Sequence, residues 1–393
     1  MNALPLRILV AHNRYQQRGG EDAVVDAEVA LLRRQGHQVE LIERHNNEIP
    51  TMGRPSLARD TLWSPQTTRQ CRLASADFRP DVLHVHNTFP LISPSIYWAA
   101  ARAGIPVVQT LHNFRLLCPQ AMLLRDGKVC EDCVGHLPWR AAVHGCYHGS
   151  PLQSGLVAGM LAAHRALGTW QSRITRYIAL NEFCKQKFID GGLPAERIVV
   201  KPNFVDLPPE EEGERQGGLY VGRLAAEKGI AVLLVALEQL GDTTLRFAGD
   251  GPQQEQIAAH GRAHWLGPLA PTQVWREMRR AAYLVMPSLW YENFPRTLVE
   301  AFACDLPVIA SRLGALAELI DDGRTGLLFD PGNPMDLAAK IRWAQANPAA
   351  LARMGLTARR EYEEKYTAKI NHRQLVAIYR DAIAAVQMEH QRA

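Results

Sequence analysis

Short apolar runs alternate with amphipathic helical patterns along most of this chain. The first run, residues 7–12, reads Arg-Ile-Leu-Val-Ala-His. The apolar positions of 21–35 then recur with the 3.6-residue period of a helix, and Gly36 follows as a helix stop. Residues 38–43 read as the next strand. This order predicts a β-loop-α-β unit whose first turn contains Gly19 and Gly20.

The same alternation continues through both halves of the chain. In the first half, further strands are expected at 81–86, 107–112, 177–180 and 198–201. In the second half, strands are expected at 218–222, 244–248, 283–287, 306–310 and 326–329, with a helix at about 230–240. Apolar strands separated by helices are typical of parallel sheets covered on both faces. The predicted fold class is therefore α/β, with two Rossmann-like, doubly wound domains facing across a cleft. Ligands of such sheets bind at the carboxyl ends of the strands.

The best candidate for a linker is the segment 202–217. It contains three prolines, two glycines and an acidic cluster. We therefore expect a first domain at 1–205 and a second at 206–369. The tail is helical in pattern from 362 to 387, and its part from about 370 to 393 is expected to pack back on the first domain.

Composition excludes several classes of protein. Of 393 residues, 47% are hydrophobic and 21% charged, which excludes a disordered or fibrous chain and suffices for two cores. The formal net charge of +4 is too small to indicate a nucleic-acid partner. Neither a targeting segment nor a run of about 18 apolar residues is present. A cytoplasmic location with reduced thiols is therefore expected.

Positive charge is concentrated between residues 82 and 181, where eight bases accompany three acids. Trp139, Tyr147, Trp170 and the run 156–163 lie in the same stretch. A basic, aromatic and apolar surface suits anionic lipid headgroups, which predicts peripheral contact with the inner face of a membrane. The alternatives are a solvated basic face and a pocket for an anionic substrate.

Four cysteines in the first half have the spacing C-x11-C-x2-C-x12-C. They are Cys118, Cys130, Cys133 and Cys146. The middle pair has zinc-knuckle spacing, so four thiolates would close a structural zinc site. The alternative is a set of reduced, partly buried thiols. His84 and His86 alternate on a predicted strand and are expected to be packing residues.

The loop at 222–229 joins a predicted strand to a predicted helix. Backbone amides at a helix start favour an anion. Arg223 offers a planar fork and Lys228 a point charge, which together suit a diphosphate. An ordinary turn with two surface cations is the alternative.

Two carboxylates, Glu292 and Glu300, flank the start of another predicted helix. Pro295 suits the first helical position, so Glu292 is expected in the loop and Glu300 in the helix. A carboxylate accepts two hydrogen bonds at once and can hold the vicinal diol of a ribose or a sugar. Purely structural acids are the alternative.

These motifs occur in a fixed order within one domain: the loop at 222–229, then a loop at 249–251, then a loop at 265–267, then the Glu292–Glu300 block. The first domain adds the glycine pair at 19–20 and Leu-His-Asn at 111–113. This order resembles family 4 glycosyltransferases, the glycosyl transferases group 1, over nearly the whole chain. These are retaining enzymes of the GT-B fold.

The resemblance implies a nucleotide-sugar donor, either a UDP-sugar or a GDP-sugar. It implies that Arg223 and Lys228 hold the donor diphosphate, that Glu300 holds the ribose hydroxyls and that Glu292 holds the transferred sugar. With His112, which would hydrogen-bond that sugar, these groups form the implied catalytic set. The remaining implied donor-binding residues are Gly19, Gly20, Gly222, Gly249, Gly251, Leu266, Asn293, Phe294 and Pro295.

The acceptor implied by the resemblance is a glycan or a lipid-linked saccharide, in polysaccharide or lipopolysaccharide assembly. No Asp-x-Asp motif is present, which fits the GT-B pattern, in which cations of the protein replace a divalent metal at the diphosphate. The resemblance therefore implies that catalysis needs no cofactor. Many relatives carry a small residue where Asn293 stands, which leaves the donor sugar open. The rival readings are an inactive nucleotide-sugar-binding partner subunit and an epimerase of the same fold.

Overall fold

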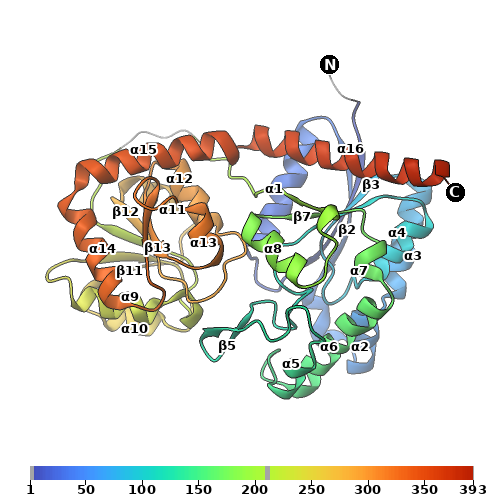
Figure 1. The fold of residues 1–393 in the computed structure, drawn as a ribbon, viewed down its shortest axis with the longest axis horizontal. Coiled ribbons are helices and arrows are strands. Elements are labelled where there is room, and N and C mark those ends of the chain that lie inside the picture. The colour runs from blue at the N-terminus through green and yellow to red at the C-terminus, as the bar shows by residue number, and fades with distance from the viewer. Residues whose placement is uncertain (1–3, 209–212, 393) are drawn as a thin grey trace. The chain divides into compact units, whose positions relative to one another are not determined.

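The computed structural model describes residues 4–208 and 213–392, so residues 209–212 of the predicted linker lie outside the described residues. The chain forms two compact units (Figure 1). Of the described residues, the first unit contains 4–122, 131–202 and 371–392. The second contains 123–130 and 203–370.

The first unit is built on a parallel six-stranded sheet in the order β2-β1-β3-β4-β7-β8. Six consecutive residues of β1 are buried, because this strand lies between two neighbours and under helices. β2 alternates exposed and buried residues, as an edge strand does. The strands are β1 (Arg7–Arg14), β2 (Gln38–His45), β3 (Val82–Asn87), β4 (Val107–Thr110), β7 (Arg176–Ala179) and β8 (Ile198–Val200).

Helices connect these strands. They are α1 (Gly20–Arg34), α2 (Arg54–Leu62), α3 (Pro65–Asp77), α4 (Ser95–Arg102), α5 (Trp139–Val143), α6 (Pro151–Ala166), α7 (Thr169–Ser172) and α8 (Glu182–Asp190), with the 3-10 turns η1 (Asn46–Thr51) and η2 (Ala195–Arg197). The last helix, α16 (Ala368–Arg392), lies along this unit, where Leu375 and Tyr379 join α1 and β1 in one apolar cluster.

The second unit repeats the design with a parallel sheet in the order β11-β10-β9-β12-β13-β14. Its strands are β9 (Gly218–Val221), β10 (Leu245–Ala248), β11 (Ala263–Gly267), β12 (Tyr283–Met286), β13 (Val308–Ser311) and β14 (Gly326–Phe329). Its helices are η3 (Ala226–Lys228), α9 (Ile230–Glu238), α10 (Gln254–Ala259), α11 (Pro271–Arg280), α12 (Arg296–Ala303), α13 (Gly314–Leu319), α14 (Pro334–Ala346) and α15 (Pro348–Lys365). Two apolar clusters cover the sheet, one containing Phe302 and the other Phe247.

The predicted α/β class with two Rossmann-like parallel-sheet domains is confirmed, and every predicted strand overlaps an observed one. Three details differ. The segment 265–267, expected as a loop, belongs to the edge strand β11 (Ala263–Gly267). Pro295 is the N-cap of α12 and not its first residue. The tail is broken after Lys365, and α16 begins at Ala368.

One short hairpin falls outside the simple division at residue 205. Strands β5 (Leu124–Arg125) and β6 (Lys128–Val129) pair antiparallel, and the segment 123–130 groups with the second unit. Within the part of the chain that the structure describes, no helix is long and apolar enough to cross a bilayer.

Candidate functional site

Three loops at the carboxyl ends of β9, β10 and β11 are joined by backbone hydrogen bonds. The Gly222 amide donates to Ala248 at 3.0 Å, and the Gly249 amide donates to Gly267 at 2.9 Å. The Leu224 amide donates to the Asp250 carbonyl at 2.6 Å. The second unit therefore brings the predicted donor-binding segments 222–229, 249–251 and 265–267 together at one edge of its sheet.

Glycine is required where the first two of these loops meet. Gly249 has φ +139°, and a Cβ there would lie 2.0 Å from the Gly222 carbonyl oxygen. Gly251 has φ +146°, and its Cβ would lie 2.6–2.9 Å from backbone atoms of Leu224. Because backbone atoms cannot move aside as a flexible side chain can, both positions exclude any side chain.

Trp265 and Leu266 come from β11, which sequence reasoning placed in a loop. The Trp265 indole donates from Nε1 to the Gly249 carbonyl at 2.9 Å, and Leu266 is half-buried against the core. The short run Ala-His-Trp-Leu-Gly has no β-branched residue, so periodicity did not identify it. As a strand, it fixes the 249–251 loop from the side.

Lys228 and Glu292 meet at the centre of this loop cluster. Lys228 ends η3, and its Nζ lies 2.7 Å from Glu292 Oε1. The same oxygen accepts from Ser288 Oγ at 2.7 Å and from Trp290 Nε1 at 3.1 Å. The Lys228 ammonium also lies 5.2 Å from the Trp290 ring centroid. The Glu292 side chain is only 8% exposed, so three donors, one of which is the Lys228 cation, offset its loss of water.

Arg223 lies on the surface of the same loop. Its guanidinium pairs with Glu227 one turn on, and its side chain is 58% exposed. The Tyr220 hydroxyl donates to the Arg223 carbonyl at 2.8 Å, which anchors the backbone while the side chain remains in water. An exposed ion pair contributes little stability, so breaking the Arg223–Glu227 pair needs little free energy. A ligand anion can therefore replace Glu227 as the partner of the guanidinium.

Glu300 lies in the second turn of α12, and Glu292 lies in the loop before that helix. Its Oε1 is 3.1 Å from Arg296 Nε and accepts from Trp275 Nε1 at 3.4 Å. Burial raises the pKa of the Glu300 carboxyl, and the charge of Arg296 offsets part of that rise. Between the two acids, Asn293 is buried and Phe294 packs edge-on against Tyr366. Hydrogen bonds of the second unit thus join the segments 222–229, 249–251 and 265–267 and Glu292 to one another.

In the first unit, the glycine pair begins α1. Gly19 is its N-cap and Gly20 its first residue, and the Gly19 amide donates to Asp22 Oδ2 at 2.9 Å. A Cβ on Gly20 would meet nothing within 4 Å. The backbone beside Gly20 is therefore open enough for a ligand to approach.

Glu21, directly after that pair, was not singled out from the sequence. Its Oε2 accepts from the Tyr15 hydroxyl at 2.9 Å and from Asn113 Nδ2 at 3.3 Å, while its buried Oε1 has no partner among the described residues. Burial raises the pKa of the Glu21 carboxyl to about 7. The adjacent glycines were the only sequence signal that could have found it.

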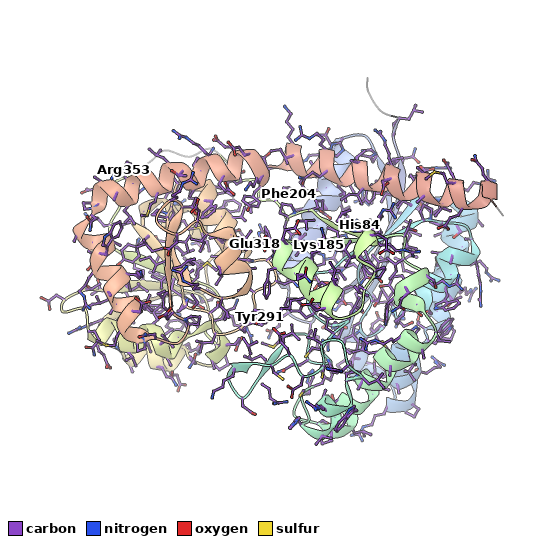
Figure 2. The ribbon with its side chains drawn as sticks, in the orientation of Figure 1. His84, Lys185, Phe204, Tyr291, Glu318 and Arg353 are labelled. Carbon is purple, nitrogen blue, oxygen red and sulfur yellow. The ribbon has the colours of Figure 1, made fainter. Side chains whose placement is uncertain are left out.

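His112 follows β4, and His86 holds it from β3. His86 Nδ1 lies 2.8 Å from His112 Nε2, and the two ring planes differ by 19°. His84, whose position in the first unit is labelled in Figure 2, is hydrogen-bonded on both ring nitrogens. Its partners are the Tyr379 hydroxyl at 2.7 Å and Thr110 Oγ1 at 2.8 Å. His84 is thus a packing residue as expected, but His86 also contacts a predicted site residue.

Two metal questions follow from these side chains. Glu28, His84 and His86 place ligand atoms within 4.8 Å of one another, but both nitrogens of His84 are already bonded and Glu28 holds the Lys201 ammonium at 2.5 Å. That donor set fits a hydrogen-bond network better than a cation. Among the described residues it is the one such trio. The four cysteines of the predicted zinc site are divided between the two units, with Cys130 in the second and the other three in the first. Structural zinc stays a prediction.

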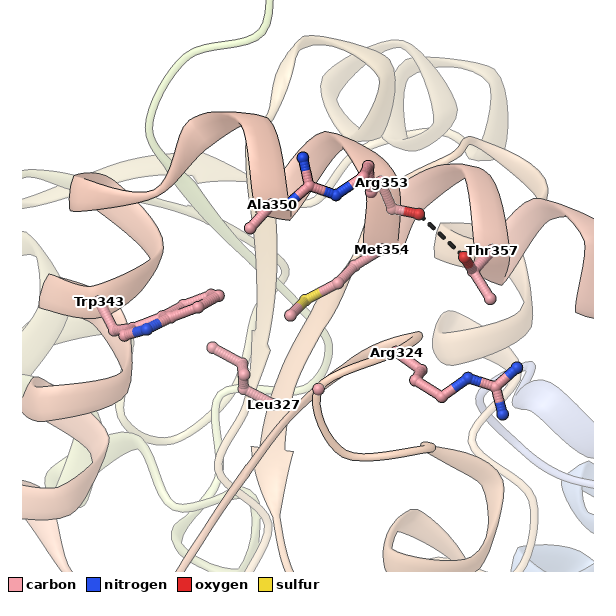
Figure 3. Close-up of a pocket in the computed structure, with 8 residues that line it drawn as sticks. Arg324, Leu327, Trp343, Ala350, Arg353, Met354 and Thr357 are labelled. Atoms are coloured by element: carbon pink, nitrogen blue, oxygen red, sulfur yellow. Dashed lines mark hydrogen bonds between the residues drawn. The ribbon is translucent and has the colours of Figure 1, made fainter.

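A cavity of about 330 Å³ lies elsewhere in the second unit (Figure 3). Trp343, Met354 and Leu327 line it with Arg324 and Arg353. It opens beside the segment that enters β14, at the amino end of that strand. Because the strands are parallel, this is the opposite edge of the sheet from the loop cluster.

Two family models cover the chain almost end to end. The model described as Glycosyltransferase Family 4 matches residues 18–208, and the model described as Glycosyl transferases group 1 matches residues 209–361. The alpha-maltose-1-phosphate synthase of Mycolicibacterium smegmatis is 30% identical over 324 residues, which are 77% of this chain and 79% of that protein. The glycogen synthase of Mycobacterium tuberculosis is 28% identical over 352 residues, 82% of each chain.

A solved structure agrees on the fold. Anabaena Alr3699/HepE in complex with UDP matches with a TM-score of 0.65 and 19% identity, over 95% of this chain and 99% of that one. The two parallel sheets, the ordered motifs and the sequence similarity lead to one conclusion: this chain belongs to glycosyltransferase family 4 and has the GT-B fold.

Proposed function

We propose that this glycosyltransferase moves a sugar from a UDP- or GDP-sugar to a glycan or lipid-linked saccharide, with retention of configuration. The observation that carries the proposal is the 2.7 Å contact between Lys228 and Glu292. A cation suited to a diphosphate and a carboxylate suited to sugar hydroxyls stand side by side, as the two ends of a nucleotide-sugar require.

In the proposed mechanism, Arg223 and Lys228 hold the diphosphate and stabilise the negative charge that develops on the leaving nucleotide. Lys228 remains beside Glu292, and Arg223 exchanges Glu227 for phosphate oxygens. These two cations take the place of a divalent metal. Turnover is therefore expected to persist after chelation with EDTA.

Glu292 Oε1 accepts hydrogen bonds from three donors, while Glu292 Oε2 accepts no hydrogen bond within the described ranges. We assign Oε2 to hydroxyls of the transferred sugar, with the backbone of Asn293 and Phe294 beside it. Glu300 accepts the ribose hydroxyls, and His112 hydrogen-bonds the donor sugar. The glycines at 19–20 and 249–251 let backbone approach the substrates.

The support for a UDP-sugar is that a structural neighbour was solved with UDP. The support for a glycan acceptor is that the similar sequences include a glycogen synthase and a maltose-1-phosphate synthase. We place the reaction in cell-surface polysaccharide or lipopolysaccharide assembly.

Contact with an anionic membrane surface would bring a lipid-linked acceptor to the enzyme. Around α5 and the start of α6, four large apolar side chains are more than half exposed: Leu137, Trp139, Val143 and Leu152. The basic side chain of Arg140 lies among them, 5.7 Å from the Trp139 ring. By contrast, Trp170 and Val157, also in the predicted membrane stretch, are core residues. The membrane-facing surface is thus narrower than the sequence indicated.

Release of UDP or GDP from a panel of nucleotide-sugars, with and without glycan acceptors, tests the proposal. Acceptor-dependent release supports a transferase. If the protein binds nucleotide-sugars but releases UDP or GDP from none of them, the inactive partner subunit is supported instead. Sedimentation with anionic and neutral vesicles tests the membrane contact. If the contact is made, the double variant Trp139→Ser/Val143→Ser binds anionic vesicles more weakly than the wild type does.

A further inference from the structure

A buried ion pair lies behind His112 in the first unit. Glu28 of α1 is 2% exposed and Lys201, after β8, is 0% exposed, and their Oε1 and Nζ atoms lie 2.5 Å apart. The other carboxylate oxygen of Glu28 lies 3.7 Å from His86 Nε2. His86 is 4% exposed, and its Nδ1 lies 2.8 Å from His112 Nε2. A series of polar atoms therefore runs from Lys201 to His112, with hydrogen-bond distances at both ends and a 3.7 Å charge contact between Glu28 and His86.

His86 and His112 are both neutral imidazoles. Burial lowers the pKa of each well below its ordinary value, and neighbouring histidines and Lys201 lower it further. In a hydrogen bond between two neutral imidazoles, one nitrogen carries the proton and the other accepts it. The direction of this bond fixes the tautomer of both rings.

The negative charge of Glu28, 3.7 Å from His86 Nε2, favours a proton on that nitrogen. Glu28 Oε2 has no hydrogen-bond partner within the described part of the chain, and the nearby His86 Nε2 is the group that can present a proton to it. A proton on Nε2 leaves His86 Nδ1 as an acceptor. His112 must then donate from Nε2, so its Nδ1 carries a lone pair.

We propose that Glu28 and His86 are positioning residues that fix His112 as the Nε2–H tautomer, so that its Nδ1 accepts a hydrogen bond from a substrate hydroxyl. This rests on the proposed role of His112 beside the donor sugar. His112 Nδ1 makes no hydrogen bond within the described residues, so it is available for that contact. The sugar must present a hydroxyl there, and a deoxy or fluoro sugar loses the bond.

The test is the ¹⁵N NMR spectrum of the histidine-labelled full chain, with His112→Gln identifying the His112 signals. The proposal requires a pyrrole-like Nε2 and a pyridine-like Nδ1. In Glu28→Gln, the new amide N–H₂ donates to His86 Nε2 and moves its proton to Nδ1. His112 then becomes the acceptor, and its two signals exchange character. Glu28→Gln alone leaves the Lys201 ammonium buried without a counter-charge, which destabilises the fold. The double variant Glu28→Gln/Lys201→Met removes that ammonium as well and is expected to fold, so it serves as the matched variant.

Kinetics give a second readout. Both variants are expected to lower kcat about tenfold or more with nucleotide affinity unchanged, because the second unit is untouched. A proton on His112 Nδ1 in the wild type, or a tautomer that both variants leave unchanged, overturns the proposal. The NMR result does not depend on turnover. Absence of activity with every donor therefore contradicts the proposed function alone.

Discussion

Lys228 Nζ lies 2.7 Å from Glu292 Oε1, although the two residues are 64 positions apart. The contact joins the loop after β9 to the loop after β12, two neighbouring strands of the sheet. Its position at the carboxyl ends of parallel strands is where an α/β sheet binds ligands. We therefore treat this pair as the centre of the donor site.

Removing the Lys228 ammonium is expected to impair chemistry more than folding. In Lys228→Ala, the leaving diphosphate loses a cation, so kcat/KM should fall by about 10²–10³. Initial-rate kinetics on the donor panel measure the change. Lys369→Ala removes an exposed lysine from α16 and serves as the control. Equal losses in the two variants would contradict a specific role for Lys228.

Glu300 is expected to recognise ribose hydroxyls. Wild-type protein should bind UDP more tightly than its 2′-deoxy analogue, and Glu300→Ala should bind both with nearly equal affinity. Each lost hydrogen bond to a charged acceptor is worth about 1.5–3 kcal/mol. Calorimetric titration of the four combinations isolates this interaction. If the variant keeps the full preference for ribose, Glu300 does not contact that hydroxyl.

Gly249→Ala is expected to destabilise the second unit by more than about 2 kcal/mol. The added methyl group meets the Gly222 carbonyl oxygen at 2.0 Å, and φ +139° strains any side chain. Thermal unfolding monitored by circular dichroism measures the change. Gly261→Ala is the matched control, since a Cβ there meets nothing within 4 Å. An unchanged Tm in Gly249→Ala would show that the two loops do not approach this closely.

The Glu21 carboxyl is expected to make stability depend on pH. Its pKa is about 7 in the folded chain against an ordinary 4.5. Between these values the folded state holds a proton that the unfolded chain has lost, so the free energy of unfolding falls as pH rises. Glu21→Gln should remove about 1–3 kcal/mol of that fall.

Urea unfolding at about pH 5 and about pH 8 measures the effect of Glu21→Gln. Glu255→Gln, in an exposed position of α10, is the control and should keep the wild-type difference between the two pH values. If Glu21→Gln also keeps the wild-type difference in the free energy of unfolding between the two pH values, ionisation of Glu21 does not destabilise the folded protein. That result would contradict the prediction.

Periodicity and turn chemistry predicted most of the fold, because strands buried on both faces read as continuous apolar runs. β1 and β13 are examples. The strand β11 was missed because it lies at an edge and mixes His264 and Trp265 with small residues. Local pattern carries little information about such a strand, whose conformation is set by its pairing with β10.

Some residues of the candidate site could also be identified from the sequence, and others could not. Arg223, Lys228, Glu292 and Glu300 could be identified because each lies in a motif of fixed spacing. Glu28 and Lys201 could not, because they are 173 positions apart and a buried ion pair has no local signature. Only the sheet, by placing β8 and α1 in one unit, brings them together.

The most direct test of the donor site is thermal stabilisation by UDP, GDP, ADP and their sugars, in the wild type and in Arg223→Ala. A ligand at 100 times its Kd adds about 2.7 kcal/mol to the free energy of unfolding. The account predicts that one nucleotide family stabilises the wild type selectively and that Arg223→Ala loses most of this shift. Stabilisation that is equal in both proteins, or absent with every nucleotide, would contradict a diphosphate site at Arg223 and Lys228.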